Sequence, residues 1–317
     1  VISGLGQTIY FDKKNINEKE LKQKEISNNI NEYLDTKKYN LIGIRDLFYD
    51  DGYIYISLQH KDINGYTINI FRSELNFNRL EFKPFFITNE YWKTYNVFSG
   101  GRIESFDKNR ILFSIGFAKN YQAPQDKKSF LGKIISIDKL TKDFKIESYG
   151  HRNPQGLFYL KNKKIIINTE HGPFGGDEVN LNFIEDQTKD KNYGWPISST
   201  GKPYPNETEI FEKNNWLIKS HKENGFLEPL KSYSPAIGIS EVVSLKENNT
   251  ENLYVSSLRA GSIYILKMSK DFKKITNEER LFFKEQRIRD LKYDSEQDLF
   301  LAIFSYTPSI AVIKKIN

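Results

Sequence analysis

The chain has 317 residues, of which 38% are hydrophobic and 14% aromatic, enough for one large all-β domain or two ordinary ones. Its net charge of +6 and pI near 9.0 come from lysines scattered among turns, so we interpret them as a solvated surface and expect no nucleic-acid partner. The absence of cysteine excludes disulfides, thiolate metal sites and thiol nucleophiles. Without an apolar run of about 18 residues, we expect no membrane span.

The first 40 residues carry the weakest pattern and remain poorly assigned. Residues 5–11 predict a strand, whereas 17–33 are rich in Lys, Glu and Asn and are compatible with a loop, a charged strand pair or a short helix. The chain begins with Val1 and has its only methionine at Met268. This beginning is what we expect of a processed or trimmed chain that has lost a signal peptide.

From residue 41 onward, short apolar runs alternate with polar turns, and no 3.6-residue period is sustained. This pattern predicts an all-β fold. The strands are expected at 46–48, 53–58, 66–72, 103–106, 111–115, 132–137, 237–245, 253–257, 262–268, 289–293, 299–304 and 310–316. A spacing of about 50 residues per four strands is compatible with six propeller blades. With no linker in sight, we predict one domain over 1–317, in which 197–229 form a long loop over the top face.

The most informative stretch is 150–196, in which apolar runs at 157–160 and 165–168 flank a polar turn and predict a β-hairpin. One end carries Arg152, whose planar fork suits a carboxylate. The other carries a Gly-Pro/Gly-Gly turn with Gly172 and Pro173, whose carbonyls, beside Asp177 and Glu178, suit a hard cation such as Ca²⁺. Alternatively the two carboxylates cap the amides of the turn, and both roles can coexist.

Three motifs in this stretch carry a family resemblance: GHRNPQG at 150–156, EHGPFGGDEVN at 170–180 and NYGWP at 192–196. Together they resemble the soluble quinoprotein glucose/sorbosone (aldose sugar) dehydrogenase family. The resemblance implies a six-bladed β-propeller that binds pyrroloquinoline quinone (PQQ) and Ca²⁺ and oxidises aldoses. In a propeller the central channel is the natural ligand site.

Two further segments match the family, SSLRAGSIY at 256–264 and RIRD at 287–290. The resemblance implies that five residues bind PQQ: Arg152, Asn153, Arg259, Arg287 and Arg289. It also implies that the metal region comprises Gly172 and Pro173, through their carbonyls, with Asp177 and Glu178. Strand alternation places Arg287 and Arg289 on the same side, as a clamp on carboxylates requires. We expect His151 and His171 to be hydrogen-bonded structural residues.

One departure from the family concerns the general base. The family's His-x-Gly-Gly-Arg segment corresponds to FSGGR at 98–102, so Phe98 replaces the histidine that takes the sugar's anomeric proton. Phenylalanine cannot accept a proton, and a positioned base contributes about 10²–10⁴-fold. The family's Gly-Asp is also altered, to Gly116-Phe117, and region 42–47 shows no counterpart of the usual glutamine. His60 or Glu104 are candidates to substitute as the base.

Three functional hypotheses follow. The first is a PQQ- and Ca²⁺-dependent dehydrogenase of an aldose or other alcohol, and the second is a non-catalytic propeller that binds a sugar, a quinone-like anion or a protein. A lactonase-type hydrolase is less favoured, because the sequence shows no carboxylate-rich metal centre. The family resemblance implies a periplasmic or secreted location, and the sequence gives no indication of oligomeric state.

Overall fold

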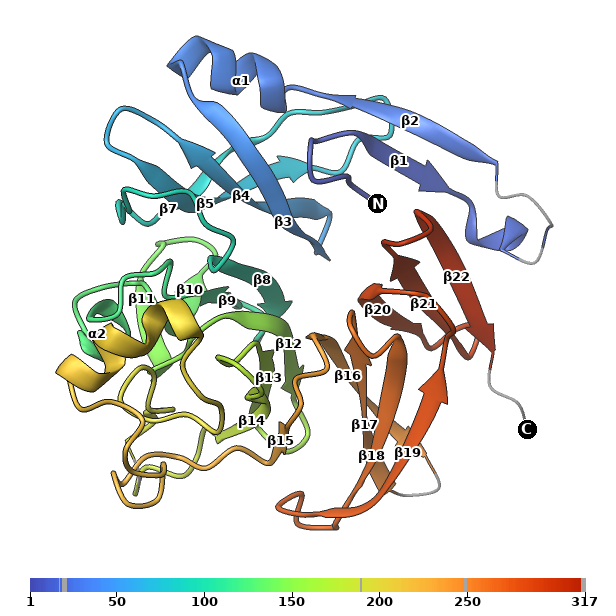
Figure 1. The fold of residues 1–317 in the computed structure, drawn as a ribbon. Coiled ribbons are helices and arrows are strands. Elements are labelled where there is room, and N and C mark those ends of the chain that lie inside the picture. The colour runs from blue at the N-terminus through green and yellow to red at the C-terminus, as the bar shows by residue number, and fades with distance from the viewer. Residues whose placement is uncertain (17, 19–21, 189, 248–249, 315–317) are drawn as a thin grey trace. The chain divides into compact units, whose positions relative to one another are not determined.

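The strands of the computed structural model form six sheets, and the fold class is the six-bladed β-propeller that the sequence predicts. The structure describes residues 1–16, 18, 22–188, 190–247 and 250–314. The chain divides into two compact units, Val1–Ile146 and Glu147–Asn317. Figure 1 labels most of the strands and the helices α1 and α2.

The first unit holds three sheets. One has the order β1-β2-β6, with β2 and β6 parallel, and the others have the orders β3-β4-β5-β7 and β8-β9-β10-β11. The strands are β1 (Thr8–Phe11), β2 (Gln23–Asn28), β3 (Asn40–Asp50), β4 (Tyr53–Lys61), β5 (Tyr66–Glu74), β6 (Arg79–Leu80), β7 (Lys83–Ile87), β8 (Gly100–Ser105), β9 (Arg110–Ile115), β10 (Lys133–Asp138) and β11 (Phe144–Tyr149), which carries the chain into the second unit.

The second unit also holds three sheets, all antiparallel, and each takes its strands in chain order. The first has β12 (Pro154–Leu160), β13 (Ile165–Glu170), β14 (Asp177–Phe183) and β15 (Lys231–Tyr233), the second has β16 (Ile239–Glu247), β17 (Thr250–Ser257), β18 (Ser262–Met268) and β19 (Ile275–Phe282), and the third has β20 (Ile288–Asp294), β21 (Leu299–Phe304) and β22 (Ser309–Lys314). This order is the meander expected of propeller blades joined by short turns.

The core of the second unit lies between neighbouring sheets. Every residue of β13 is buried. One apolar cluster joins Ile167 and Val179 to Val255, and the next joins Tyr254 to Phe300. The side chains of one strand therefore alternate between two cores, which explains why the sequence reads as short continuous apolar runs.

Helices are few and short. The α-helices are α1 (Ile30–Lys37) and α2 (Thr208–Lys213), and the 3-10 helices are η1 (Lys13–Asn15), η2 (Ala123–Gln125) and η3 (Pro205–Glu207). The ambiguous stretch 17–33 contains β2 and the start of α1, while residues 17 and 19–21 lie outside the described residues. In α1, Ile30 and Leu34 are buried four residues apart on one face, and Lys38 ends the helix in a left-handed conformation.

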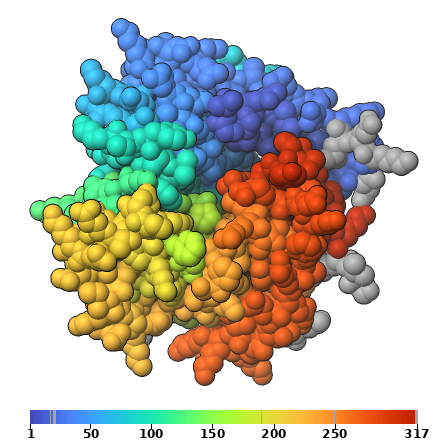
Figure 2. All heavy atoms as spheres, viewed as in Figure 1, coloured from blue at the N-terminus to red at the C-terminus, as the bar shows by residue number. Residues whose placement is uncertain are grey.

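The hairpin predicted at 157–168 is confirmed, with Leu160 opposite Ile165 at its closed end. The insert 197–229 contains η3 and α2 and lies at the surface of the second unit, in yellow in Figure 2. It is anchored by Phe211, whose ring centroid lies 5.5 Å from that of Trp195 and 5.6 Å from that of Trp216. None of the described helices is long and apolar enough to cross a bilayer.

Candidate functional site

The strands β12, β16 and β20 meet near their N-terminal ends in the second unit. Predicted arginines lie just before β12 and at the start of β20, and the amide of Arg259 donates to the carbonyl of Ile237, just before β16, at 2.9 Å. The Leu157 amide of β12 donates to the Glu241 carboxylate of β16 at 3.2 Å. The Ser240 hydroxyl donates in turn to the Ile288 carbonyl of β20 at 2.6 Å. These bonds place the turn before β12, the start of β16 and the 287–290 segment next to one another.

The Gly172–Asp177 corner is a tightly packed turn tied to the segment before β12. The His171 amide donates to the Asn153 carbonyl at 3.1 Å. A Cβ on Gly172 would lie 1.7 Å from the Gly176 carbonyl oxygen, so only glycine fits there. The Pro173 carbonyl accepts from the Gly176 amide at 3.2 Å, which leaves that oxygen one lone pair for another partner.

Arg152 supports this corner from a buried position. Its side chain is buried and donates through Nη1 to the His171 carbonyl at 3.0 Å. The guanidinium carbon lies 5.1 Å from the Trp195 ring and 5.8 Å from the Tyr204 ring, within the range of cation–π attraction. These contacts therefore hold the Arg152 side chain in place against the Gly172–Asp177 corner.

Asp177 and Glu178 are buried and hydrogen-bonded to neighbouring segments. Asp177 accepts from the Ile239 amide at 2.9 Å, and Glu178 accepts from the Thr200 hydroxyl at 2.9 Å. Burial by itself raises the pKa of Asp177, but the hydrogen bond and charge of His171, with the backbone amides, bring that pKa below its ordinary value. Burial, followed by the nearby charge of Glu170, raises the pKa of Glu178. These contacts tie the carboxylates to neighbouring segments, whereas the sequence analysis offered capping of the turn's own amides as their structural role.

His151 and His221 form hydrogen bonds inside the protein. The His151 ring stacks on Tyr193 at 4.7 Å and hydrogen-bonds Ser148 and Glu170 at 2.8 and 3.2 Å. His221 contacts the Tyr193 carbonyl at 3.1 Å, and burial lowers its pKa. The void among these residues, Arg152 and Glu178 measures about 10 Å³, too small for an organic ligand.

The other three predicted arginines are exposed. Arg259 lies in the turn between β17 and β18, and Arg287 and Arg289 flank the fully buried Ile288 at the start of β20. The pairing of β20 with β21 shifts register between Ile288 and Asp290, so Arg289 lies at a β-bulge. These guanidinium groups can reach a ligand from solvent.

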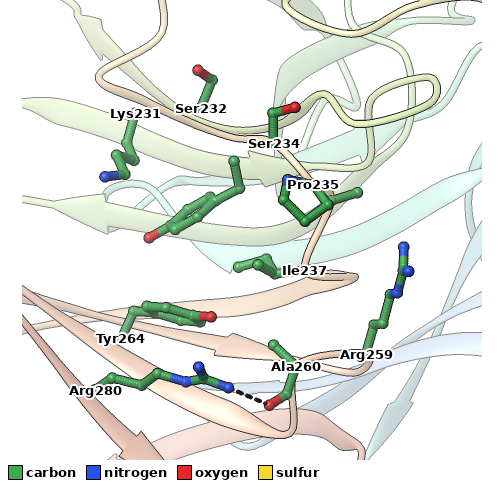
Figure 3. Close-up of a pocket in the computed structure, with 11 residues that line it drawn as sticks. Lys231, Ser232, Ser234, Pro235, Ile237, Arg259, Ala260, Tyr264 and Arg280 are labelled. Carbon is green, nitrogen blue, oxygen red and sulfur yellow. Dashed lines mark hydrogen bonds between the residues drawn. The ribbon is translucent and has the colours of Figure 1, made fainter.

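A cavity of about 470 Å³ adjoins Arg259 in the second unit, a size typical of small-molecule sites. Its walls come from the 231–237 segment and from β18 and β19 (Figure 3). It borders the Gly172–Asp177 corner, because a Cβ on Gly175 would lie 3.2 Å from the Ser234 hydroxyl oxygen. Sequence reasoning found Arg259 but missed the rest of this pocket, which is built from residues far apart along the chain.

Phe98 lies in the first unit and is half-buried. Its ring centroid is 5.6 Å from that of Phe117, and Lys119 Nζ lies 5.6 Å from its ring. The Phe98 carbonyl accepts from the Ala118 amide at 2.9 Å. The two positions at which the sequence departs from the family, 98 and 117, therefore form one aromatic contact.

The segment around Phe98 contacts a buried glutamine, Gln59, that the sequence analysis did not identify. Gln59 is fully buried on β4, accepts from Arg45 Nε at 2.9 Å and from the Ser99 hydroxyl at 3.2 Å, and donates to the Asn96 carbonyl at 3.1 Å. The signal that could have found it is a polar residue inside a strand of buried residues. Sequence reasoning searched the preceding strand instead.

His60 and Glu104, the candidate substitute bases, have separate environments. The His60 ring is 2% exposed, stacks on Tyr39 at 4.7 Å and contacts Asn69 at 3.0 Å. Burial lowers its pKa to about 4. The Glu104 carboxylate accepts the amide of Ser105 at 2.8 Å. His60 is therefore a structural residue of the first unit.

Within the described ranges, no group of three or more His, Cys, Asp or Glu side chains could hold a metal ion. Any cation held at the Gly172–Asp177 corner would depend on main-chain carbonyls and on oxygens from a ligand.

The family model for Glucose / Sorbosone dehydrogenase matches residues 40–305, and the chain belongs to this family. An uncharacterized protein of Synechocystis sp. is 34% identical over 164 residues, which cover 44% of this chain and 37% of that protein. Aldose sugar dehydrogenase YliI of Escherichia coli is 27% identical over 222 residues, which cover 64% and 56%. Quinoprotein glucose dehydrogenase B of Acinetobacter calcoaceticus is 36% identical over 107 residues, which cover 32% and 19%. The chain thus spans between 19% and 56% of the length of these relatives.

Solved structures share the fold over nearly the whole chain. A glucose dehydrogenase has a TM-score of 0.76 at 19% identity and covers 99% of this chain and 98% of its own. The PQQ-bound form of aldose sugar dehydrogenase from Streptomyces coelicolor has a TM-score of 0.67 at 17% identity, covering 98% and 91%. At these identities the likeness shows the fold alone.

Proposed function

We propose that this chain binds PQQ together with Ca²⁺ and is a dehydrogenase-like protein of an aldose or another alcohol. The observation that carries the proposal is that β12 and β20, which begin beside Arg152, Arg287 and Arg289, both contact the start of β16. The turn that carries Arg259 is hydrogen-bonded to Ile237, just before β16, and the chain belongs to the glucose/sorbosone dehydrogenase family. We further infer a periplasmic or secreted location, as the family resemblance implies.

The residues present fit an anionic cofactor. PQQ is a tricarboxylate, and Arg259, Arg287 and Arg289 are exposed cations with the planar fork that pairs with carboxylates. Arg152 would act indirectly, since its guanidinium holds the His171 carbonyl and thereby the corner. Asn153 holds the same corner through its carbonyl. Bound PQQ would supply the capacity to accept hydride from an alcohol carbon.

The Gly172–Pro173 turn fits Ca²⁺ as a source of carbonyl oxygens, the hard ligands that this ion prefers. The carboxylates of Asp177 and Glu178 already accept hydrogen bonds from Ile239 and Thr200, and we assign them to the support of the turn. In this arrangement Ca²⁺ would need further oxygens from PQQ, so that each ligand promotes binding of the other.

In this proposal turnover is limited, because Phe98 occupies the position of the family's general base. The aromatic contact of Phe98 with Phe117 favours a second candidate function, a non-catalytic propeller. Such a protein would bind a sugar, a quinone-like anion or a protein without oxidising it. The two functions differ in whether a proton can leave the alcohol when the cofactor is loaded.

The test is titration of the purified chain with PQQ and Ca²⁺, followed by dye reduction with a panel of aldoses. We expect a bound-cofactor absorbance band and slow dye reduction. Phe98→His should raise the rate at least about tenfold, since a positioned base contributes about 10²–10⁴-fold. Phe98→Leu is the matched control, because it removes the same ring without adding a base.

Three outcomes decide between the candidates. Failure of PQQ to bind would show that the arginine assignments are wrong. Binding without dye reduction, even in Phe98→His, would favour the binding module. Equal acceleration by the leucine and histidine variants would show that ring removal, and not a base, limits the rate.

A further inference from the structure

The cavity beside Arg259 has two facing walls. Lys231, Ser232 and Ser234 lie on one side in Figure 3, and Tyr264 and Arg280 lie on the other. The rings of Tyr233 and Tyr264 are 5.1 Å apart, and Pro235, Ala236, Ile237 and Ala260 complete the lining. At about 470 Å³ the cavity can hold a ligand of one or two sugar rings in size.

The lining is cationic and contains no carboxylate. Its charged residues are Lys231, Arg259 and Arg280. Arg280 Nη2 donates to the Ala260 carbonyl at 3.0 Å, so this guanidinium is held in place. The structure gives the exposed Arg259 side chain no partner among the residues it describes, and its fork is available to a ligand. A pocket lined by one sign of charge concentrates ligands of the other sign.

A carboxylate lies beside Lys231. Glu278 on β19 pairs with Lys231 on β15 at 2.9 Å, with side-chain exposures of 30% and 34%. Lys231 Nζ also lies 5.3 Å from the Tyr233 ring. Glu278 therefore competes with any anion that approaches Lys231, and its removal would increase the positive potential of the pocket.

The cavity lies beside the corner that we assign to the cofactor. Ser234 packs against Gly175 of that corner, and Gly238 packs against the Arg259 backbone. A molecule in the cavity would thus extend outward from the corner toward β18 and β19. Its anionic group would be placed away from the corner, near Lys231 and Arg280.

We propose that this cavity recognises the anionic group of an acidic sugar, a carboxylate or a phosphate, through Lys231, Arg259 and Arg280. The inference rests on the proposed function only for the choice of a sugar as the ligand. Arg280 donates through Nε to the Ser262 hydroxyl at 2.7 Å and through Nη2 to the Ala260 carbonyl, so it offers Nη1 to the anion. The ammonium of Lys231 pairs with the same anion, while Tyr233 and Tyr264 contact the apolar face of the sugar ring.

The test is calorimetric titration of the full chain with glucuronate, glucose 6-phosphate and glucose, at low and high salt, before PQQ is added. We expect at least one acidic sugar to bind about tenfold more tightly than glucose, and salt to reduce the difference. The two acidic sugars separate the carboxylate from the phosphate as the natural group.

Two opposite variants and a control make the test specific. Lys231→Gln should weaken binding of the acidic sugar about fivefold, and Glu278→Gln should strengthen it. Lys161→Gln, an exposed lysine in the turn between β12 and β13, should leave binding unchanged. Equal binding of acidic and neutral sugars, or the same effect of Lys231→Gln and Glu278→Gln, would overturn the proposal.

The acidic-sugar proposal and the proposed cofactor function can be tested independently. PQQ loading is read by absorbance in a second experiment on the same protein. Loss of PQQ binding with intact acid-sugar binding would reject only the cofactor proposal, and the reverse result would reject only the acidic-sugar pocket.

Discussion

His60 shows how one buried side chain can make stability depend on pH. Its pKa is lowered to about 4 by burial, against about 6.5 in an unfolded chain. Protons therefore bind the unfolded state preferentially between these two values. The contribution of His60 to the free energy of unfolding is fully present above pH 6.5 and is lost as pH falls toward 4.

We predict that His60→Gln weakens the pH dependence of stability. In the wild type, acidification from pH 7 to 4 should remove up to about 3 kcal/mol through this residue. The free energy of unfolding would be measured by urea denaturation at several pH values, with the variant compared with the wild type at each. A variant whose stability falls as steeply as that of the wild type would show that His60 does not titrate as described.

Gly172 is a position where packing alone dictates the residue. We predict that Gly172→Ala destabilises the protein by about 3 kcal/mol, because its Cβ would lie 1.7 Å from the Gly176 carbonyl oxygen and the backbone must move. Gly4→Ala is the control, since nothing lies within 4 Å of its Cβ. Similar melting temperatures for the two variants would contradict the tight packing of the corner.

At the scale of elements, the sheets of the first unit are joined by buried polar contacts as well as by apolar packing. Asp46 on β3 accepts from the Ile103 amide on β8 at 2.8 Å and pairs with Arg102 at 3.1 Å. The side chains of Asp46 and Arg102 are only 9% and 11% exposed. Such a contact fixes one sheet against its neighbour more strongly than an exposed ion pair can.

We predict that Asp46→Asn lowers the free energy of unfolding by about 3 kcal/mol, because it removes the negative charge from a buried ion pair and hydrogen bond that join β3 to β8. Glu185→Gln serves as the comparison, because Glu185 pairs with Lys164 at the surface, with 71% and 58% side-chain exposure. That variant should change stability by less than about 0.5 kcal/mol. If both changes had the same effect, burial would not be what gives the β3–β8 contact its strength.

Elements with strong local patterns were predictable, and those defined by their neighbours were not. The hairpin of β12 and β13 follows from apolar runs around a lysine turn, and the structure confirms it. The edge strand β19 reads as charged and largely exposed, and it exists because β18 offers a partner for its backbone. The short helix α2 owes its place to Phe211, which packs on Trp195 from another segment and on Trp216 just after the helix.

At the scale of the whole molecule, the proposed ligands should stabilise the folded chain. A ligand at about 100 times its dissociation constant adds about 2.7 kcal/mol, which we expect to raise the melting temperature by about 5 °C. PQQ with Ca²⁺ should produce this shift, and PQQ with a chelator a smaller one. Benzene-1,3,5-tricarboxylate is the control for charge alone. If it stabilises the protein as much as PQQ does, the effect is non-specific attraction to a chain of net charge +6.

The sequence by itself determined the class of fold and the family, because strand periodicity, turn glycines and short motifs are local properties of the chain. It did not determine which side chains face a ligand: Arg152 proved to be buried behind the corner, whereas Arg259 borders an open cavity. It also could not indicate the cavity, whose walls are contributed by β15, β18 and β19. Only tertiary structure decides such features, because exposure, desolvation and pocket volume depend on which distant segments pack together.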